Sequence, residues 1–599
     1  MSEQAQWLAP NLDRATPAIA DDFQTRQRWR FWLLAFGLFL LVIVVMARLV
    51  SVQLFTSAQQ TNRFDVALKA QPRGTIVDRH GELLAADRFY YQLTASPDLI
   101  ETDDDRMLVA QQLNALVGTP IDSVFTVLKS DEQKKWTSLA DKISLDQGEA
   151  LLNFQKDVAQ RDDSAAILYV ALEPIPVRYY PQDSLANYIV GLVNLNRESL
   201  NGVERYYDRF LRAEGNGSAS NQVVAPLNSL PSDVLRFLPS VSGNDLVLTI
   251  DRGAQWIVED ELRQGMERYR AQKGTIIVME PSTGAILAMA SWPNYDPNHY
   301  SDAPYERFLD PAISEQYEPG SIFKIITMAT ALDTETVTPT MPFQDVGSVE
   351  CGTRIIMNAN RTAYGIVDVT KALALSLNVV TSQVAEKVGE ANFYQYVRRF
   401  GFGSPTEIDL GGEIAGLLKT PGNEDWSQSD LCTNSFGQGI AVTPLQMVNA
   451  AAAIANGGKL MRPYVVQSRV VNGRVLTTEP TVVHQVIQEQ YAKELTEMMV
   501  ETVQTSNIAA SVLGYKVAGK SGTAQIPGPD GYLEDQIVGS FIGFAPADDP
   551  KFVILVKIER PDFKLTQWAD QNAVPIFGRV ARRLFLHLNI PPDDVRLAN

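Results

Sequence analysis

The sequence predicts an α+β protein, with an antiparallel sheet covered by helices and a single membrane-spanning helix near the N-terminus. Two pairs of apolar runs predict the sheet: residues 274–279 with 285–291, and residues 539–548 with 551–558. A short turn separates the members of each pair, as in a β-hairpin. The first pair follows a helix-like segment that begins at Asp251, and a hairpin beside a helix is typical of an antiparallel sheet with helical cover.

An uncharged apolar run near the N-terminus predicts the membrane span. It covers residues 31–47, and apolar character resumes after Arg48, whose charged group can reach the lipid headgroups. A buried helix of a soluble domain would show a polar face, which this run lacks. The run is longer than the core of a signal peptide, and no small-residue cleavage site follows it, so we expect an uncleaved anchor over residues 31–54.

Basic residues set the orientation of this anchor. Three arginines stand just before it: Arg26, Arg28 and Arg30. The positive-inside rule therefore places the polar tail, residues 1–30, in the cytoplasm and the rest of the chain outside it. We expect a single-pass membrane protein, whose main body works without cytoplasmic nucleotides.

Size and charge restrict the class of protein. The chain has 599 residues, so at roughly 100–200 residues per domain we expect three or four units. Hydrophobic residues make up 45% and charged residues 20%, which is a globular composition. The formal net charge of −18 argues against a nucleic-acid partner, because phosphate binding needs a basic surface.

Further elements are expected on both sides of a boundary near residue 245. The turn-rich residues 240–245 mark this boundary. Before it we expect a hairpin at 73–85, a strand at 90–95, a helical region at 101–165 and a mixed segment at 178–217. After it we expect a strand at 246–250 and, at the end of the chain, an amphipathic helix around RVARRLFLHL.

Cysteines and histidines give no metal site. The two cysteines, Cys351 and Cys432, do not form a CxxC motif, and two ligands cannot hold zinc alone. They could pair in an oxidising compartment, but sequence separation says nothing about distance, so pairing is left open. The four histidines are scattered without ligand spacing. We expect neither a metal nor a cofactor.

The first candidate catalytic pair is Ser321 and Lys324, in the segment Glu-Pro-Gly-Ser-Ile-Phe-Lys. The Pro-Gly pair ends an extended stretch before a helix-like run, so Ser321 is expected at a helix N-terminus, with Lys324 on the same face. A lysine can take the serine proton if burial or another cation lowers its pKa from about 10.4 toward neutrality. Alone, the pair fits at least as well a capping serine with a surface lysine.

Two further motifs follow along the chain. Ser376 and Asn378 flank Leu377, and alone they would be a polar break at the start of a helix. The run Lys520–Thr523 (Lys-Ser-Gly-Thr) is expected on an edge strand, where its glycine lets another backbone approach. Its lysine and two hydroxyls suit an anionic group such as a carboxylate.

The third motif overlaps a competing pattern. Residues 514–521 fit the phosphate-binding string GxxxxGKS. That string needs a helix after its lysine, whereas strand-like residues surround Lys520. An extracytoplasmic location also removes ATP, so we disfavour a nucleotide-binding loop.

The three motifs, in this order and behind an anchor, resemble those of the penicillin-binding protein and serine β-lactamase superfamily: S-x-x-K, S-x-N and K-[ST]-G. This chain departs from frequent members at two positions. Leu377 stands where many β-lactamases have Asp, and Ser521 stands where many members have Thr. Both departures keep the required hydroxyl and amide groups.

The resemblance implies a role for each residue. Ser321 would attack the penultimate D-Ala carbonyl of a stem peptide, Lys324 would take its proton, and Ser376 would relay a proton to the leaving amine. Lys520 would also keep Lys324 neutral by repulsion, and the backbone N–H groups of Ser321 and Thr523 would form the oxyanion hole. The implied substrate-binding residues are Asn378, Lys520, Ser521, Gly522 and Thr523.

Three segments narrow the resemblance to class B, monofunctional penicillin-binding proteins. Residues 73–85 (RGTIVDRHGELLA) look like the class B signature, residues 201–208 like its G-x-E-x-x-Y-D segment, and residues 436–439 like its G-Q-G loop. No glycosyltransferase domain stands between the anchor and this signature, which excludes class A. The expected units are a tail at 1–30, an anchor at 31–54, an elongated α+β pedestal or dimerisation domain at 55–245, a transpeptidase domain at 246–590 and a tail at 591–599.

The resemblance implies a D,D-transpeptidase that cross-links peptidoglycan stem peptides in elongation or division and is acylated by β-lactams. It also implies a SEDS-type glycan polymerase as a membrane partner. Three alternatives stay open: a carboxypeptidase or β-lactamase of the same fold, a β-lactam sensor, and an idle scaffold that activates a polymerase through residues 54–245. The long N-terminal half argues against a β-lactamase, and the short tail offers no effector for a sensor.

Overall fold

The computed structural model describes residues 73–162, 164–212, 244–529 and 531–598. The predicted tail and anchor, residues 1–54, lie outside these ranges. Among the residues that are described, no helix combines the length and the apolar character needed to cross a bilayer.

The N-terminal part folds around the long strand β2 (Leu83–Ala95), which pairs antiparallel with β1, β3 and β4. Helices α3 and α5 pack on this sheet around a core that includes Leu93, Leu113 and Leu151. The elements of this part are β1 (Ile76–Val77), η2 (Pro97–Leu99), α3 (Asp103–Val117), α4 (Ile121–Ser130), β3 (Thr137–Ile143), α5 (Leu145–Ala159), η3 (Ala166–Tyr169), β4 (Val170–Tyr179), α6 (Asn187–Val190), α7 (Gly202–Tyr206) and α8 (Asp208–Leu211).

The predicted hairpin at 73–85 is confirmed, with one difference. The Asp78 carboxylate accepts hydrogen bonds from the backbone N–H groups of His80 and Glu82, both at 2.8 Å, which closes the turn. The strand expected separately at 90–95 is the second half of β2, because β2 pairs with β1 at one end and with β3 and β4 at the other. The region expected to be helical also contains β3.

The second part is built on a five-stranded antiparallel sheet in the order β16–β17–β18–β6–β7. Both predicted strand pairs belong to it, and the third motif lies on its edge strand β16, as expected. The strands are β6 (Lys273–Met279), β7 (Ile286–Trp292), β16 (Ala518–Gly528), β17 (Gly531–Ala545) and β18 (Phe552–Glu559).

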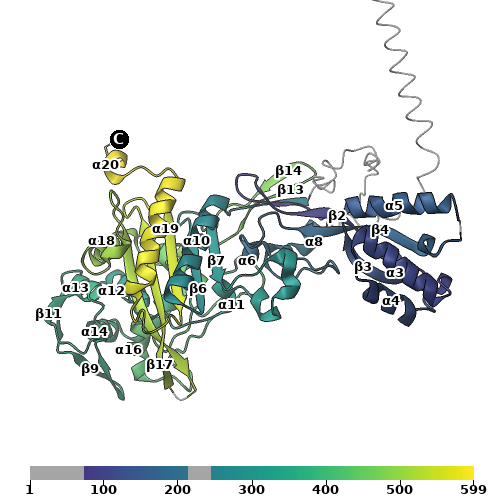
Figure 1. The fold of residues 1–599 in the computed structure, drawn as a ribbon. Coiled ribbons are helices and arrows are strands. Elements are labelled where there is room, and N and C mark those ends of the chain that lie inside the picture. Colours follow the sequence, from purple (N-terminus) through teal and green to yellow (C-terminus); the bar gives the residue numbers. More distant parts are fainter. Residues whose placement is uncertain (1–72, 163, 213–243, 530, 599) are drawn as a thin grey trace, which may run out of the picture. The chain divides into compact units, whose positions relative to one another are not determined.

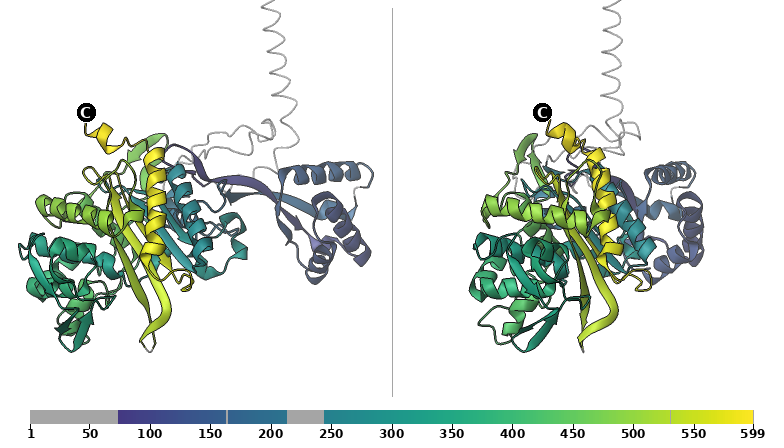
Figure 2. Two further views of the ribbon diagram at one scale, coloured as in Figure 1. Left: turned by 60° about the vertical axis from the view of Figure 1, so that its left-hand side comes forward. Right: turned by 90° about the vertical axis from the view of Figure 1, so that its left-hand side faces the viewer.

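Helices cover both faces of this sheet, as Figures 1 and 2 show. Alternate residues of a strand point to opposite faces. Accordingly, Ile276 packs into one core with α10 (Arg252–Tyr269) and α19 (Ala573–His587). Ile277 packs into the other core, with α12 (Lys324–Asp333) and α17 (Pro444–Ala455). The expected helix from Asp251 is α10, whose first turn the Asp251 side chain caps through Ala254 N–H.

The two parts share one sheet. Strand β5 (Asn244–Leu248) pairs parallel with β1 and antiparallel with β13 (Val466–Val471). The resulting path runs β14–β13–β5–β1–β2–β3, with β4 joined to β2. The strand expected at 246–250 is therefore shifted by two residues, and Asn244 and Asp245, expected at the turn-rich boundary, are the first residues of a strand that belongs to both parts.

The remaining described elements all belong to the second part, and most were not predicted individually. They are η5 (Pro297–Asp302), η6 (Tyr305–Phe308), α11 (Pro311–Ser314), η7 (Gly320–Phe323), β8 (Pro342–Asp345), β9 (Ser348–Cys351), β10 (Arg354–Met357), β11 (Gly365–Asp368), α13 (Val369–Ala374), α14 (Asn378–Val388), α15 (Glu390–Arg399), α16 (Gln428–Ser435), β12 (Lys459–Met461), β14 (Arg474–Thr477), β15 (Val482–Gln485), α18 (Glu489–Thr505), η8 (Ile508–Ala510), η9 (Ala569–Gln571) and α20 (Asp593–Arg596). The predicted tail at 591–599 contains α20, where Arg596 pairs with Asp548 at 2.5 Å.

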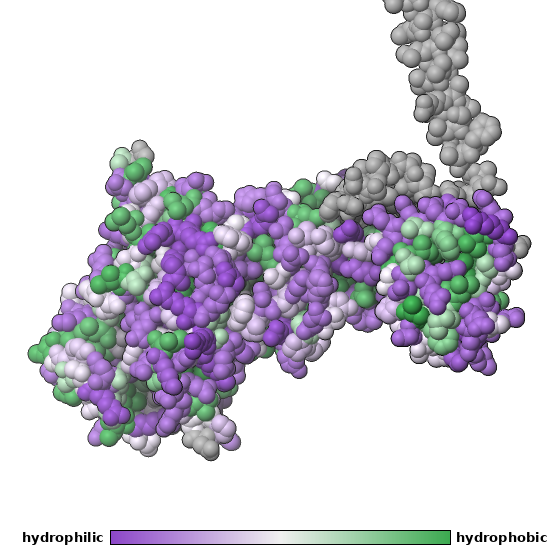
Figure 3. Space-filling view, in the orientation of Figure 1, coloured by the Kyte–Doolittle hydropathy of each residue, from purple (hydrophilic) through white to green (hydrophobic). Residues whose placement is uncertain are grey.

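The visible face of the molecule is mainly hydrophilic (Figure 3). Hydrophobic residues gather there over the helices of the N-terminal part. Leu108 on α3, which is half exposed, is one exposed apolar side chain of that part.

Candidate active site

The fold brings the first two motifs into direct contact. The Lys324 amine lies 2.6 Å from the Ser376 carbonyl oxygen and 2.8 Å from Asn378 Oδ1, and it donates a hydrogen bond to each. Ser376 Oγ lies 3.2 Å from the same nitrogen. Ser376 and Asn378 are more than 50 positions from Lys324 in sequence, so tertiary packing assembles the cluster.

Ser321 lies in the turn that leads into α12, one of the helices that pack on the five-stranded sheet. Residues Gly320–Phe323 form η7, which runs directly into α12 at Lys324. The expected position at a helix N-terminus is therefore confirmed, although the first turn is a 3-10 turn. Three residues per turn place positions i and i+3 above one another, so Ser321 and Lys324 share a side of this turn. Ser321 is half-buried, whereas Lys324 is fully buried.

Burial controls the charge of Lys324. Its pKa is held well below the usual value, first because burial disfavours the ammonium form and then because Lys520 repels it. Lys520 is also buried, at 1% exposure. Burial lowers the pKa of Lys520 to about 8, while Asp570 acts in the opposite direction. Lys520 therefore keeps its proton more readily than Lys324 does.

The second motif sits in the junction between α13 and α14. Ser376 has a left-handed backbone, with φ of 59°, which turns its carbonyl and its hydroxyl toward Lys324. Leu377 is 2% exposed and belongs to the hydrophobic core, so an apolar residue fits the middle of the motif. Asn378 begins α14, and its amide donates to the Met357 carbonyl at 3.1 Å.

The third motif runs along β16 against the Ser321 turn. A Cβ atom on Gly522 would stand 2.9 Å from Ile322 N and 3.0 Å from Pro319 O. Only glycine lets the strand come this close. The residues on either side, Ser521 and Thr523, are half-buried and lie on the same side of the strand because side chains alternate.

The Phe436–Gly439 loop closes against the same turn. Gly320 N–H donates to Gly437 O at 3.0 Å. Gly437 has a φ of 79°, and a Cβ there would stand 2.3 Å from Gly320 O. The predicted G-Q-G loop is therefore a backbone neighbour of Ser321.

Several residues of the site were not predicted. Glu318 accepts hydrogen bonds from Gly439 N–H at 2.9 Å and from the Tyr532 hydroxyl at 3.0 Å. Behind the third motif, Asn507 contacts the Ser521 hydroxyl, and Asp570 contacts Asn507. Glu318 opens the segment that contains Ser321 and Lys324, but nothing in that segment indicated its hydrogen bonds. Asn507, Tyr532 and Asp570 belong to no local pattern, so spacing along the chain offered no signal for them.

The structure answers two questions that the sequence left open. Cys351 and Cys432 form a disulfide with a Cα–Cα distance of 6.5 Å, which joins β9 to α16. With Glu386 they form the one group of metal-ligand residues found among the described residues, but both sulfurs are bonded to each other. The lysine of the GxxxxGKS string lies on β16 rather than before a helix, so the string is not a phosphate-binding loop.

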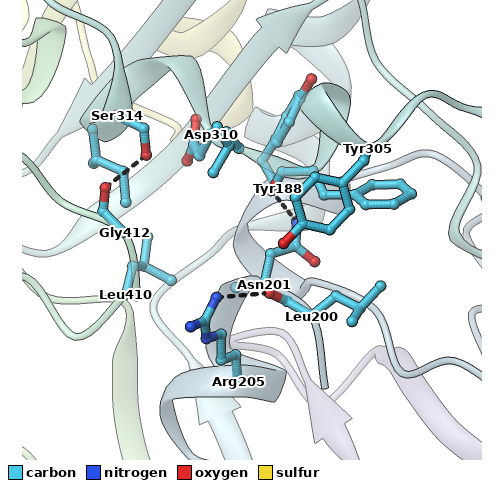
Figure 4. Close-up of a pocket in the computed structure, with 14 residues that line it drawn as sticks. Tyr188, Leu200, Asn201, Arg205, Tyr305, Asp310, Ser314, Leu410 and Gly412 are labelled. Atoms are coloured by element: carbon cyan, nitrogen blue, oxygen red, sulfur yellow. Dashed lines mark hydrogen bonds between the residues drawn. The ribbon is translucent and has the colours of Figure 1, made fainter. Parts of the chain in front are cut away.

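A separate cavity lies away from these motifs (Figure 4). Its volume of about 30 Å³ has room for one or two water molecules. Tyr188, Asn201, Asp310 and Gly412 are among the residues that line it, and burial raises the pKa of Asp310 to about 7. No predicted site residue lines this cavity, so it stands apart from the candidate active site.

Comparison with known protein families matches both parts of the chain. Residues 274–582 match the penicillin-binding protein transpeptidase domain, and residues 69–248 match the penicillin-binding protein dimerisation domain. Stage V sporulation protein D of Bacillus subtilis is 32% identical over 87% of this chain and 79% of its own length. The peptidoglycan D,D-transpeptidase FtsI of Escherichia coli K12 is 26% identical over 94% of this chain and 93% of its own.

Solved structures agree with this assignment. Penicillin-binding protein 3 of Mycobacterium tuberculosis, in complex with aztreonam, has a TM-score of 0.65 and 25% identity. The match covers 87% of this chain and 98% of that one. The same protein in complex with ampicillin matches with the same TM-score. The chain therefore belongs to the class B penicillin-binding proteins, the serine D,D-transpeptidases that cross-link peptidoglycan and bind penicillin.

Proposed function

We propose that Ser321 is the nucleophile of this transpeptidase and Lys324 its general base. The observation that carries the proposal is the environment of the Lys324 amine. A neutral amine has two N–H groups and one lone pair. The Ser376 carbonyl and Asn378 Oδ1 accept the two N–H groups, so the lone pair is left to take a hydroxyl proton, and the Ser376 hydroxyl also lies within 3.2 Å of the nitrogen.

The acylation step follows from this arrangement. Ser321 Oγ attacks the carbonyl carbon of the penultimate D-Ala while Lys324 takes the hydroxyl proton, and a tetrahedral oxyanion forms. The C–N bond then breaks, and the proton held by Lys324 passes through the Ser376 hydroxyl to the leaving amine of the terminal D-Ala. An amine of a second stem peptide attacks the resulting ester, loses a proton, and returns Ser321 to its hydroxyl form.

Substrate binding is assigned to the third motif and to Asn378. Lys520, Ser521 and Thr523 hold the terminal carboxylate, and Gly522 keeps β16 beside the nucleophile. The backbone N–H groups of Ser321 and Thr523 stabilise the oxyanion, and one such donor is typically worth about 3–4 kcal/mol of barrier. Asn378 holds the substrate amide. Neither a metal nor a cofactor has a part in these steps.

The location and the partner are also proposals. Residues 31–54 anchor the chain in the bacterial inner membrane, with residues 1–30 in the cytoplasm and the catalytic part outside. The disulfide supports this placement, because disulfides persist in oxidising compartments. The pedestal, residues 55–245, contacts a SEDS-type polymerase, and residues 246–590 form the transpeptidase domain.

Exposure of the purified full-length protein to penicillin tests the catalytic assignment. Intact-mass measurement and peptide mapping should find a long-lived adduct on Ser321, and Ser321→Ala should abolish it. An adduct that clears within seconds would indicate a β-lactamase, and release of D-Ala to water in preference to an amine would indicate a carboxypeptidase. A folded protein without any adduct would leave only the scaffold.

A further inference from the structure

Asn507 makes three hydrogen bonds behind the third motif. It follows α18 and is 2% exposed. Its Nδ2 group donates to Ser521 Oγ at 3.1 Å and to Asp570 Oδ1 at 2.8 Å. Its Oδ1 atom accepts from Ser521 N–H at 3.3 Å. The amide oxygen therefore binds β16, and the NH₂ group binds both β16 and η9.

The chemistry of its partners fixes the orientation of this amide. A backbone N–H can only donate, and an ionised carboxylate can only accept. Asn507 must therefore present oxygen to Ser521 N–H and the NH₂ group to Asp570. The second N–H of the same NH₂ group then points to Ser521 Oγ, which makes this hydroxyl oxygen an acceptor.

Thr523 receives a similar hydrogen bond from another element. Its Oγ1 atom accepts from Ala569 N–H, in η9, at 3.0 Å. Within the part of the chain that the structure describes, neither Ser521 Oγ nor Thr523 Oγ1 donates to a protein acceptor. Each hydroxyl therefore receives an N–H from the protein and keeps its own proton for another group.

We propose that Asn507, held by Asp570, and the Ala569 backbone N–H are positioning groups that fix the Ser521 and Thr523 hydroxyls as hydrogen-bond donors toward the cleft. A carboxylate accepts hydrogen bonds and never donates them, so this polarity selects a ligand with a terminal carboxylate. The inference deepens the proposed function and rests on it. Neither Asn507 nor Asp570 touches the reacting atoms.

Reversal of the polarity at one position gives a direct test. In Asn507→Asp, an acceptor replaces the NH₂ group, and Ser521 donates its proton to the new carboxylate instead of to the ligand. This carboxylate faces Asp570, so the double variant Asn507→Asp/Asp570→Asn restores a donor–acceptor pair between these positions. The double variant keeps the number of hydrogen bonds and the net charge and reverses the Ser521 hydroxyl, while the carboxylate that supports the Lys520 charge moves from position 570 to position 507.

The measured quantity is a ratio of acylation rate constants. One β-lactam is used with its free carboxylate and as its neutral methyl ester, and the two second-order rate constants are compared. We expect this ratio to fall about 10-fold to 100-fold in both variants, the usual worth of one hydrogen bond to a charged group. In a Ser521→Ala background, Asn507→Asp should change the ratio no further.

The outcomes are separable. An unchanged ratio, or an equal loss for both ligands, would overturn the proposal, because a purely structural role weakens both alike. A wild-type protein that neither ligand acylates would refute the proposed function instead. A cooperative thermal unfolding transition of the double variant should show that it is folded.

Discussion

At the scale of single residues, two buried lysines dominate the site. Lys324 and Lys520 are 0% and 1% exposed, and burial lowers the pKa of both. Lys324 is also repelled by Lys520, whereas Asp570 helps Lys520 to keep its proton. Two lysines with different pKa values can take different roles. The neutral Lys324 suits a general base, and the charged Lys520 suits a group that holds an anion.

The pH dependence of acylation should reveal this division. The pKa of Lys520 is about 8, so its positive charge is lost as pH rises through that value. For a carboxylate-bearing β-lactam, we expect kcat/KM to fall about tenfold per pH unit above it. Stopped-flow acylation across pH 6–10, roughly the titration range of these groups, would measure the decline. A neutral ester should not show it, and parallel declines for both ligands would contradict the assignment.

A methyl group at Gly522 should separate the strand from the nucleophile. In Gly522→Ala the new Cβ would stand 2.9 Å from Ile322 N, a contact with rigid backbone, so β16 must move. We expect acylation to slow at least tenfold, because a displacement of about 1 Å can cost a hundredfold in rate. Penicillin acylation kinetics measure the effect. Ala524→Gly, on the same strand, is the matched control and should lose far less.

At the scale of elements, the half-buried carboxylate of Glu318 connects the β16–β17 hairpin to the turn that contains Ser321 and to the Phe436–Gly439 loop. Glu318 accepts from Tyr532, near the hairpin tip, and from Gly439 in the neighbouring loop. Burial raises the pKa of Glu318. The two hydrogen bonds join the three backbone segments that frame Ser321.

Removal of one hydroxyl tests this link. In Tyr532→Phe the hairpin loses its exposed hydrogen bond to Glu318. We expect acylation to slow about threefold to tenfold, the usual worth of an ordinary hydrogen bond, because this bond acts on Ser321 only through the backbone. Hydrogen exchange should quicken at the hairpin tip and stay unchanged in β6. Equal exchange in the variant and the wild type would show that the bond does not hold the hairpin.

The sequence predicted those elements whose signal is local. Strands β6, β7 and β18 are apolar runs bounded by turns, and these were found. The run predicted at 539–548 covers only the later part of β17, which begins at Gly531 with polar residues. Strand β3 was missed because its surroundings are charged and helical, and it is a strand through its pairing with β2. Among the site residues, Ser321 and Lys324 are close in sequence and match a motif. Asn507 reaches Asp570 across 63 residues, a relation that spacing cannot predict.

At the scale of the whole molecule, a buried ion network lies within the N-terminal part. Glu204 pairs with Arg73 at 2.5 Å and with Arg178 at 2.6 Å, and Arg73 also pairs with Asp208 at 2.7 Å. Arg73, Glu204 and Asp208 belong to the two class B segments noted in the sequence. The signature residues therefore have a structural role in joining β1, β4, α7 and α8.

Loss of the central charge in this network should destabilise the fold. Glu204→Gln leaves two buried guanidinium groups without their shared carboxylate, and removal of one partner of a buried pair typically costs about 3–5 kcal/mol. Urea unfolding followed by far-UV circular dichroism would measure the loss. Glu149→Gln, at an exposed position on α5, is the control, and a similar small change in both variants would argue against the network.

The disulfide should stabilise the second part. It links residues 81 positions apart, and a native disulfide typically contributes about 2–4 kcal/mol. We expect Cys351→Ala/Cys432→Ala to lower the Tm by several degrees in calorimetry. A reductant should lower the Tm of the wild type and leave the double variant unchanged, and a reductant effect on the variant would point to another cause.

The shared sheet also constrains the order in which the chain can fold. Strand β5 is bonded to β1 on one side and to β13 on the other, and β13 is synthesised long after both. During synthesis, one edge of β5 therefore stays unpaired until residues 466–471 have emerged. Long-range pairing of this kind is slow to form. An exposed strand edge is a template for wrong partners, so the interval before β13 arrives is when the nascent chain most needs protection from aggregation.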